Sequence, residues 1–396
     1  MRTELGLQEL DEREVPSGWW SADDPVFLLD LELLREFTER LRELDYLSLQ
    51  YVPVKFSWTA LTSEYKNLVN LRWPRWHRLF HGSVLPSLYL GMLGRGSGAL
   101  PVCLDAMFLS HPVRSELLTK YFGQELVDRA LECHFLREEN GLVSAAFSFV
   151  PVGDYILLRD NFEMYGNNNV HNRRYRVWLG SESIPFAEFL RFFFAGRRFD
   201  RVLEVGSGTG IQALVASETS DRCVAVDYNE RAVRFTAINS ALQGRGNIEA
   251  RFSDLYSNVD GEFDVILANP WFCELRTGGL EEVPGIVDGL ETHLRDGGYC
   301  LLTLNSYVRG RSNPVLTYLG YFAMRKKYDI ELFTIGYGTE PARLESWKQH
   351  GITHTVCYNA VLKKGGKGAV RVHDIGLTRK LVQFAKIRAS RIRQAL

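Results

Sequence analysis

A glycine-rich turn in the second half of the chain is the strongest candidate for binding chemistry. The segment 202–210 reads VLEVGSGTG and holds Gly206, Ser207, Gly208 and Gly210. Glycine lets the backbone turn tightly and approach a ligand closely, and a turn between a strand and a helix lies at the ligand crevice of a doubly wound sheet. We therefore expect a ligand to bind against the backbone of this turn.

An acid just before the turn indicates the charge of that ligand. Dinucleotide-binding turns have the spacing GxGxxG, but the third glycine of that pattern would fall on Ile211. The spacing here is GxGxG, and Glu204 precedes its first glycine. A carboxylate repels a pyrophosphate and attracts a cation. The turn thus favours a cationic amino-acid ligand with an ammonium or sulfonium group over NAD.

Two more acids follow later strands of the same region. Asp227 ends the apolar strand expected at 222–227, where it can accept hydrogen bonds from both hydroxyls of a ribose. The alternative is that Asp227 caps a helix, just before Asn229. Asp254 can accept from the exocyclic amine of adenine, while Leu255 and Tyr228 enclose the ring. Together these residues predict a nucleoside site beside the glycine turn.

The sequence Asn269-Pro270-Trp271-Phe272 ends a further apolar stretch. The amide oxygen of Asn269 and the carbonyl of Pro270 are two acceptors that can hold an –NH₂ group and direct its lone pair. Phe272 can stack on a planar substrate. Positioning of this kind can supply most of the catalysis in a group transfer. The alternative is a strand-terminating turn with core aromatics.

The elements that must position these residues alternate between strands and helices from residue 200 onward. Helices are expected at 229–242 and 281–295. Apolar strands are expected at 201–205, 222–227, 263–268, 298–304 and 329–335. Short apolar strands that alternate with helices predict a parallel sheet covered on both faces.

The N-terminal half has a different pattern. Apolar spacing predicts a helix over 28–44, and 101–136 is typical of two or three short helices. An Asn-Gly turn at 140–141 then begins a β-rich run, so the region resembles a winged-helix module. A helix is also expected at 184–195.

These patterns divide the chain into four parts. We expect a substrate-capping or oligomerisation domain at 1–160, a linker and cofactor lid at 161–195, the ligand-binding domain at 196–365, and a basic C-terminal helix at 366–396.

Composition narrows the class of protein. The chain has 396 residues, of which 45% are hydrophobic and 24% charged, as in ordinary globular proteins. It has no apolar run near the ~18 residues of a membrane span and no basic, apolar leader, so we expect a cytoplasmic protein that does not bind membranes. Its six cysteines form no CxxC pair, and no HExxH occurs, so we expect reduced thiols and no metal site.

Charge is distributed unevenly. Residues 1–195 carry a net charge of −6, and the remainder carries +5. The segment 363–396 has ten Lys or Arg and one acid. This tail fits a solvated amphipathic helix, or alternatively a contact with an anionic partner. The acidic first half is unlike a nucleic-acid-binding domain.

Together the motifs resemble class I S-adenosylmethionine-dependent methyltransferases of the NPPY type, over residues 176–362, with Trp271 in place of the second proline. The resemblance implies a Rossmann-like doubly wound sheet and S-adenosylmethionine as cofactor. It also implies that the glycine turn binds methionine, Asp227 ribose and Asp254 adenine, and that the tetrad 269–272 holds the acceptor. The segment 178–183, with Glu182, is similar to one that closes over the cofactor.

Several acceptors fit this resemblance. We expect N-methylation of a small metabolite, of amino-acid or guanidine type, with Glu182 and Glu274 paired to a cationic substrate. The basic tail and the arginines within 173–176 favour a nucleobase in RNA or DNA instead. A protein glutamine, or a non-catalytic scaffold that only binds the cofactor, are further alternatives. The N-terminal part can also form a homodimer contact.

Overall fold

The computed structural model describes most of the chain, and its residues fall into two compact units. Unit 1 is Met1–Leu179 with Asn229–Gly246, and unit 2 is Gly180–Tyr228 with Asn247–Leu396. The described residues are 25–51, 98–108, 110–160, 177, 179, 183–270, 279–338, 347 and 349–374.

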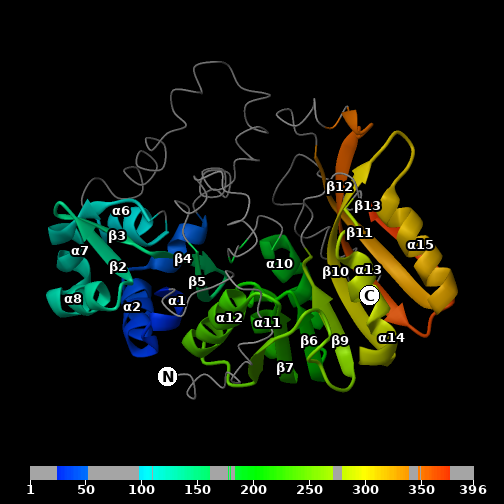
Figure 1. The fold of residues 1–396 in the computed structure, drawn as a ribbon, viewed down its shortest axis with the longest axis horizontal. Coiled ribbons are helices and arrows are strands. Elements are labelled where there is room, and N and C mark those ends of the chain that lie inside the picture. The colour runs from blue at the N-terminus through cyan, green and yellow to red at the C-terminus, as the bar shows by residue number, and fades with distance from the viewer. Residues whose placement is uncertain are drawn as a thin grey trace. The chain divides into compact units, whose positions relative to one another are not determined.

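Unit 2 is built on an eight-stranded sheet, in the order β13-β11-β12-β10-β9-β6-β7-β8 (Figure 1). The strands are β6 (Phe199–Val205), β7 (Ser220–Asp227), β8 (Ile248–Phe252), β9 (Phe263–Ala268), β10 (Leu294–Val308), β11 (Tyr328–Gly338), β12 (His354–Lys364) and β13 (Val370–Asp374). Strands β6 to β10 pair in parallel, while β12 lies antiparallel between β10 and β11.

The order of the strands reverses beside β6. From β6 the chain adds β7 and β8 on one side and then returns to place β9 on the other side. Val205 therefore pairs with both Val226 and Ala268 at the carboxyl ends of the three strands. In open α/β sheets, ligands bind outside the carboxyl ends of the strands at such a reversal.

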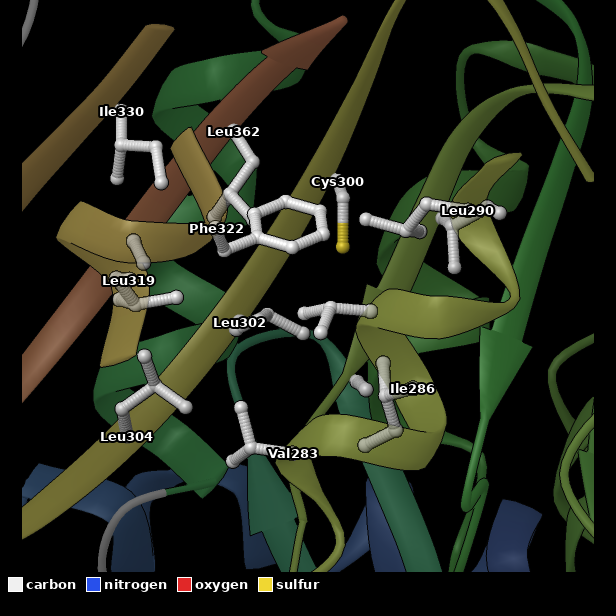
Figure 2. Packing of buried hydrophobic residues seen from close by; sticks show 14 of the residues in the cluster. Val283, Ile286, Leu290, Cys300, Leu302, Leu304, Leu319, Phe322, Ile330 and Leu362 are labelled. Atoms are coloured by element: carbon white, nitrogen blue, oxygen red, sulfur yellow. The ribbon is translucent and has the colours of Figure 1, made fainter. Parts of the chain in front are cut away.

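Helices cover both faces of this sheet because its strands are apolar on both sides. On one face, α13 (Val283–Asp288), α14 (Leu290–His293) and α15 (Pro314–Lys326) enclose a buried cluster that includes Ile286, Leu302 and Phe322 (Figure 2). The opposite face is packed by α10 (Ser183–Phe194), which contacts α11 (Ile211–Ser217). The ring of Phe189 lies 5.4 Å from that of Phe333.

Unit 1 contains short helices followed by hairpins, the pattern for which the sequence resembled a winged-helix module. Strand β1 (Val113–Arg114), helices α7 (Ser115–Phe122) and α8 (Gln124–Glu132), and strands β2 (Leu136–Glu139) and β3 (Leu142–Ala145) form a sheet in the order β1-β3-β2. Asn140 and Gly141 have φ of 54° and 75°, which the tight turn between β2 and β3 requires.

The other elements of unit 1 pack around a second hairpin. They are α1 (Pro25–Leu28), α2 (Leu31–Glu43), η2 (Tyr46–Tyr51), α6 (Ala99–Cys103), η4 (Leu104–Phe108), β4 (Phe147–Val152), β5 (Tyr155–Asp160) and α12 (Glu230–Leu242). None of the helices in the described ranges is long and apolar enough to cross a membrane.

Helix α12 follows β7 in the chain but packs within unit 1, where its side chains form hydrogen bonds with the backbone of β5. Asn239 accepts a hydrogen bond from Leu158 N at 2.7 Å and donates to Leu158 O at 2.9 Å. Gln243 Nε2 donates to Ile156 O at 2.9 Å. These amides replace a neighbouring strand, since buried backbone groups need partners.

A buried ion pair joins the same two elements. Arg231 on α12 binds Asp160 at the end of β5, with side-chain exposures of 7% and 0%. Asp160 also accepts a hydrogen bond from Val177 N at 2.8 Å. Because the pair is buried, removal of either side chain would destabilise the fold by leaving the charge of the other one buried.

The predicted fold class is confirmed, but two local predictions differ from the structure. The helix expected at 281–295 is interrupted at Gly289, and Leu294 already begins β10. The basic helix expected from residue 366 is wrong over Val370–Asp374, which pairs with β11 as β13. The part of that segment at 375–396 lies outside the described residues. The sequence analysis did not predict β12 or α15.

Candidate functional site

The glycine turn is attached to the neighbouring strand through its backbone. Gly206, Gly208 and Gly210 have φ of 75°, 54° and 77°, a region that favours glycine. The N–H groups of Gly206 and Ser207 donate to Val226 O at 2.8 and 3.0 Å. The turn then leads into α11, whose N-cap is Gly210. Its conformation is thus set before any ligand binds.

Asp227 lies beside this turn at the end of β7. Its Oδ2 accepts a hydrogen bond from Gly208 N at 3.0 Å, and its side chain is largely buried. The helix cap that was the alternative role belongs to Asn229, whose side chain accepts from Arg231 N. Asp227 therefore holds the glycine turn, a contact that the sequence analysis missed.

Glu204 places a buried carboxyl group beneath the turn. Its Oε2 accepts from Ala213 N at 2.9 Å, and the residue is fully buried. Its Oε1 has no hydrogen-bond partner among the described residues. Burial raises the pKa of Glu204 well above its usual value, and the charge of Asp227 adds to the effect. A buried carboxyl group of this kind can release its proton when a cationic ligand binds and then accept a hydrogen bond from that ligand.

The predicted adenine contacts lie on two exposed loops. Tyr228 follows β7 and is 39% exposed, while Asp254 is exposed and Leu255 half-buried after β8. Leu255 has a φ of 48°. A Cβ atom on Gly285 of α13 would lie 2.6 Å from Leu255 Cδ1, so this glycine lets α13 support the loop. The sequence analysis did not single out Gly285.

Asn269 follows β9 at the same edge of the sheet. It is half-buried, and its Nδ2 donates to Ser183 Oγ at 3.0 Å. Ser183 is the first residue of α10, and Pro270 is buried. Four other candidate residues lie outside the described residues: Trp271, Phe272, Glu182 and Glu274.

The structure brings the described candidates to one edge of the sheet. Strand pairing places the residues after Val205, Val226 and Ala268 side by side, and Asp227 pairs with Phe252 just before the Asp254 loop. The glycine turn, the three acids and Asn269 thus surround the carboxyl ends of four adjacent strands. The individual roles of these residues remain predictions.

Known proteins match this same region. The family model described as the methyltransferase small domain matches residues 187–330, which run from α10 into β11. The chain carries a class I S-adenosylmethionine-dependent methyltransferase domain. S-adenosylmethionine is the cofactor of this domain.

Over the segments that align, relatives of this methyltransferase domain are about a third identical to it. The chain is 33% identical to a ribosomal protein L11 methyltransferase of Thermotoga neapolitana over 165 residues, which cover 40% of this chain and 58% of that protein. It is 31% identical to the ribosomal RNA small subunit methyltransferase C of Klebsiella pneumoniae, over 27% of this chain and 32% of that protein. The chain therefore spans less than two thirds of the length of either relative.

Among solved structures, the domain is similar to a 16S rRNA N2 G1207 methyltransferase from T. thermophilus, in complex with AdoMet and guanosine. That similarity has a TM-score of 0.37 and 17% sequence identity, and it covers 62% of each chain.

The residues of the methyltransferase domain fit the cofactor. S-adenosylmethionine carries an ammonium and a sulfonium group, and the buried Oε1 of Glu204, which has no partner among the described residues, can accept from such a cation once the carboxyl group releases its proton. The left-handed glycines keep side chains away from the path of the ligand. Exposed Tyr228 and half-buried Leu255 offer apolar surface for a ring. We expect these residues to hold the methionine and adenine parts respectively.

Replacement of Asp227 by alanine is expected to weaken cofactor binding by about 1–3 kcal/mol, because the variant loses hydrogen bonds to an ionised, largely buried acceptor. Isothermal titration with S-adenosylhomocysteine measures this change. Asp221→Ala is the matched control, since Asp221 lies on the same strand with a side chain 53% exposed. Equal affinities of Asp227→Ala and the wild type would remove Asp227 from the site.

Glu204→Gln is expected to stabilise the protein without cofactor while weakening cofactor binding. Because burial raises the pKa of Glu204, the folded state keeps a proton that the unfolded state releases. Stability therefore falls as pH rises above the ordinary pKa of 4.5. Glutamine does not titrate and so removes this loss. The melting temperature of Glu204→Gln should therefore exceed that of the wild type at neutral pH, and this gap between the two melting temperatures should close as the pH is lowered. A gap that is constant with pH would contradict the prediction.

Proposed function

We propose that this chain transfers the methyl group of S-adenosylmethionine to an amino nitrogen of a nucleobase in ribosomal RNA. The observation that carries the proposal is the placement of Asn269. It lies at the end of β9, next to the strand that leads into the glycine turn, and its amide nitrogen is bound to Ser183. Its amide oxygen is thereby left to accept a hydrogen bond from a substrate N–H.

The residues of this site would act mainly by positioning. When bound, S-adenosylmethionine supplies an electrophilic methyl group on a sulfonium sulfur. Asn269 Oδ1 and the Pro270 carbonyl would accept the hydrogens of the acceptor –NH₂ and aim its lone pair at that carbon. The new N–C bond forms as the C–S bond breaks, its electron pair stays on sulfur, and the nitrogen then loses a proton to water. Alignment of this kind accounts for large rate factors without a general base.

The names of the relatives support a ribosomal substrate. One matching relative is named for ribosomal RNA and another for ribosomal protein L11. The small-metabolite acceptor that the sequence analysis expected, with Glu182 and Glu274 as its partners, has no support from these relatives. The capping or dimerising role of the N-terminal domain remains a proposal.

A protein nitrogen is the second candidate acceptor. The longer of the two matches is to the L11 methyltransferase, over 165 residues. An amide such as that of a glutamine side chain also presents an –NH₂ group to two acceptors, so the geometry of Asn269 suits it equally.

A labelled-methyl transfer assay separates these acceptors. Purified protein is incubated with methyl-labelled S-adenosylmethionine and, separately, with total RNA, ribosomal proteins and a metabolite extract. Label in RNA that depends on Asn269 supports the proposal, and affinity for RNA should then fall steeply with salt. Label in protein would select the second candidate, and label only in a metabolite would overturn both.

A further inference from the structure

We propose that Ser183 is a positioning residue, whose hydroxyl fixes the carboxamide of Asn269 with its oxygen toward the acceptor nitrogen. The inference rests on the proposed role of Asn269. The contact on which it is based is the 3.0 Å hydrogen bond from Asn269 Nδ2 to Ser183 Oγ. Ser183 is 5% exposed, so this bond is shielded from water.

The two ends of a carboxamide have opposite hydrogen-bonding properties. The nitrogen of Asn269 carries two donors, and the oxygen only accepts. An acceptor –NH₂ group also donates, so it can bind the oxygen but is repelled by the amide nitrogen. Because the torsion that turns this amide is broad, the end that faces the substrate has to be set by a partner. In the structure Ser183 Oγ accepts from the amide nitrogen, so the oxygen is the end turned away from Ser183.

Both residues of the pair are held by rigid elements. Asn269 directly follows β9, a strand that is paired on both sides. Ser183 begins α10, whose Phe189 and Phe193 are buried, and the ring of Phe193 lies 5.2 Å from that of Tyr299 on β10. Sites are held more accurately by such packed elements than by loops. The N-terminus of α10 therefore positions the carboxamide of Asn269, which the end of β9 supplies.

The same contact makes Ser183 a determinant of specificity. With the Asn269 oxygen directed at the substrate, the site favours acceptors that donate N–H over ring nitrogens that carry no hydrogen. An amide free to turn would present its donors part of the time and would hold an –NH₂ group less well. Ser183 would thus select amino and amide nitrogens without touching the substrate.

The first test compares Ser183→Ala with Ser183→Thr. The alanine variant should lower the turnover number about 10- to 100-fold, because small misplacements in a site cost that much. Its affinity for S-adenosylhomocysteine should stay near that of the wild type. Threonine keeps the hydroxyl and should restore most of the turnover. Equal turnover of Ser183→Ala and the wild type would overturn the proposal.

A double-mutant cycle tests whether Ser183 acts through Asn269. In an Asn269→Ala background, Ser183→Ala should cause no further loss of turnover, since there is no amide left to orient. A merely structural role would give the same fold loss in both backgrounds, and that additive result would contradict the inference.

A measurement without turnover keeps this inference separate from the proposed function. The side-chain ¹⁵N–¹H signals of Asn269, assigned by their loss in Asn269→Asp, should shift in Ser183→Ala and stay in place in Ser183→Thr. Signals that are unchanged in Ser183→Ala would refute the contact. If the wild type methylates no acceptor while these signals shift, the proposed function fails and the positioning contact stands.

Discussion

Asn269→Ala is expected to lower the turnover number of the enzyme at least about 100-fold, while the affinity for S-adenosylhomocysteine stays nearly unchanged. The reason is that the proposed function places this side chain against the acceptor, and Asn269 follows β9, on the opposite side of β6 from β7 and Asp227. It would therefore contribute to alignment of the nitrogen and not to the binding of the cofactor. Steady-state methyl transfer and calorimetry on the same preparation measure the two quantities.

Asn269→Asp provides the matched comparison for that variant. Aspartate keeps an oxygen of the same reach but carries a charge and has no amide donor for Ser183. Its turnover should lie between those of the wild type and the alanine variant. Turnover of Asn269→Ala at the wild-type level would exclude the side chain from acceptor binding, and a parallel loss of cofactor affinity would place it in the cofactor site instead.

Arg231→Met is expected to cost about 3–5 kcal/mol of unfolding free energy, because it leaves the fully buried carboxylate of Asp160 without its cation. Methionine keeps the apolar stem of the side chain near the ring of Phe235, over which the guanidinium now lies at 5.8 Å. The loss should therefore report mainly on the buried charge. Urea unfolding at neutral pH measures it.

The control for that prediction is an exposed ion pair elsewhere in the chain. Arg198 and Asp221 form a pair with side-chain exposures of 75% and 53%, so Arg198→Met should change stability by no more than about 1 kcal/mol. Losses of the same size in the two variants would mean that burial does not govern the Asp160 pair.

Local signals in the sequence were enough to predict the parallel part of the sheet. Short apolar runs such as 263–268 are punctuated by turns and helical periods, and each became a buried strand. The glycine turn could also be predicted from local sequence, because glycine allows a left-handed φ, and Gly206 has such a φ in the structure. The Asn-Gly turn at 140–141 likewise became the tight turn between β2 and β3.

Contacts between distant segments could not be predicted in this way. Helix α12 has the expected helical pattern, but its sequence does not indicate that Asn239 will form hydrogen bonds with the backbone of β5. The pairing of Ser183 with Asn269 joins residues 86 positions apart and leaves no periodic signal. Strand β12 was missed because its antiparallel pairing with β10 and β11 depends on tertiary structure and not on a strand–helix alternation.

The nature of the acceptor was the least predictable feature. The net charge of −6 over residues 1–195 favoured a small metabolite, whereas the relatives of the domain are named for ribosomal RNA and ribosomal protein. Net charge describes long-range attraction to a partner, while the acceptor atom is chosen by a few groups at the site. Under the proposed function, Asn269 and Ser183 would favour a nitrogen that carries hydrogen.

The most direct test of the proposed function is nucleoside analysis of RNA after methyl transfer in vitro. Ribosomal RNA is incubated with S-adenosylmethionine and either the wild type or Asn269→Ala, digested to nucleosides and examined by mass spectrometry. We expect an N-methylated nucleoside with the wild type that is nearly absent with the variant. RNA without any new methylated nucleoside, while ribosomal protein or a metabolite takes up the methyl group, would contradict the assignment to a nucleobase.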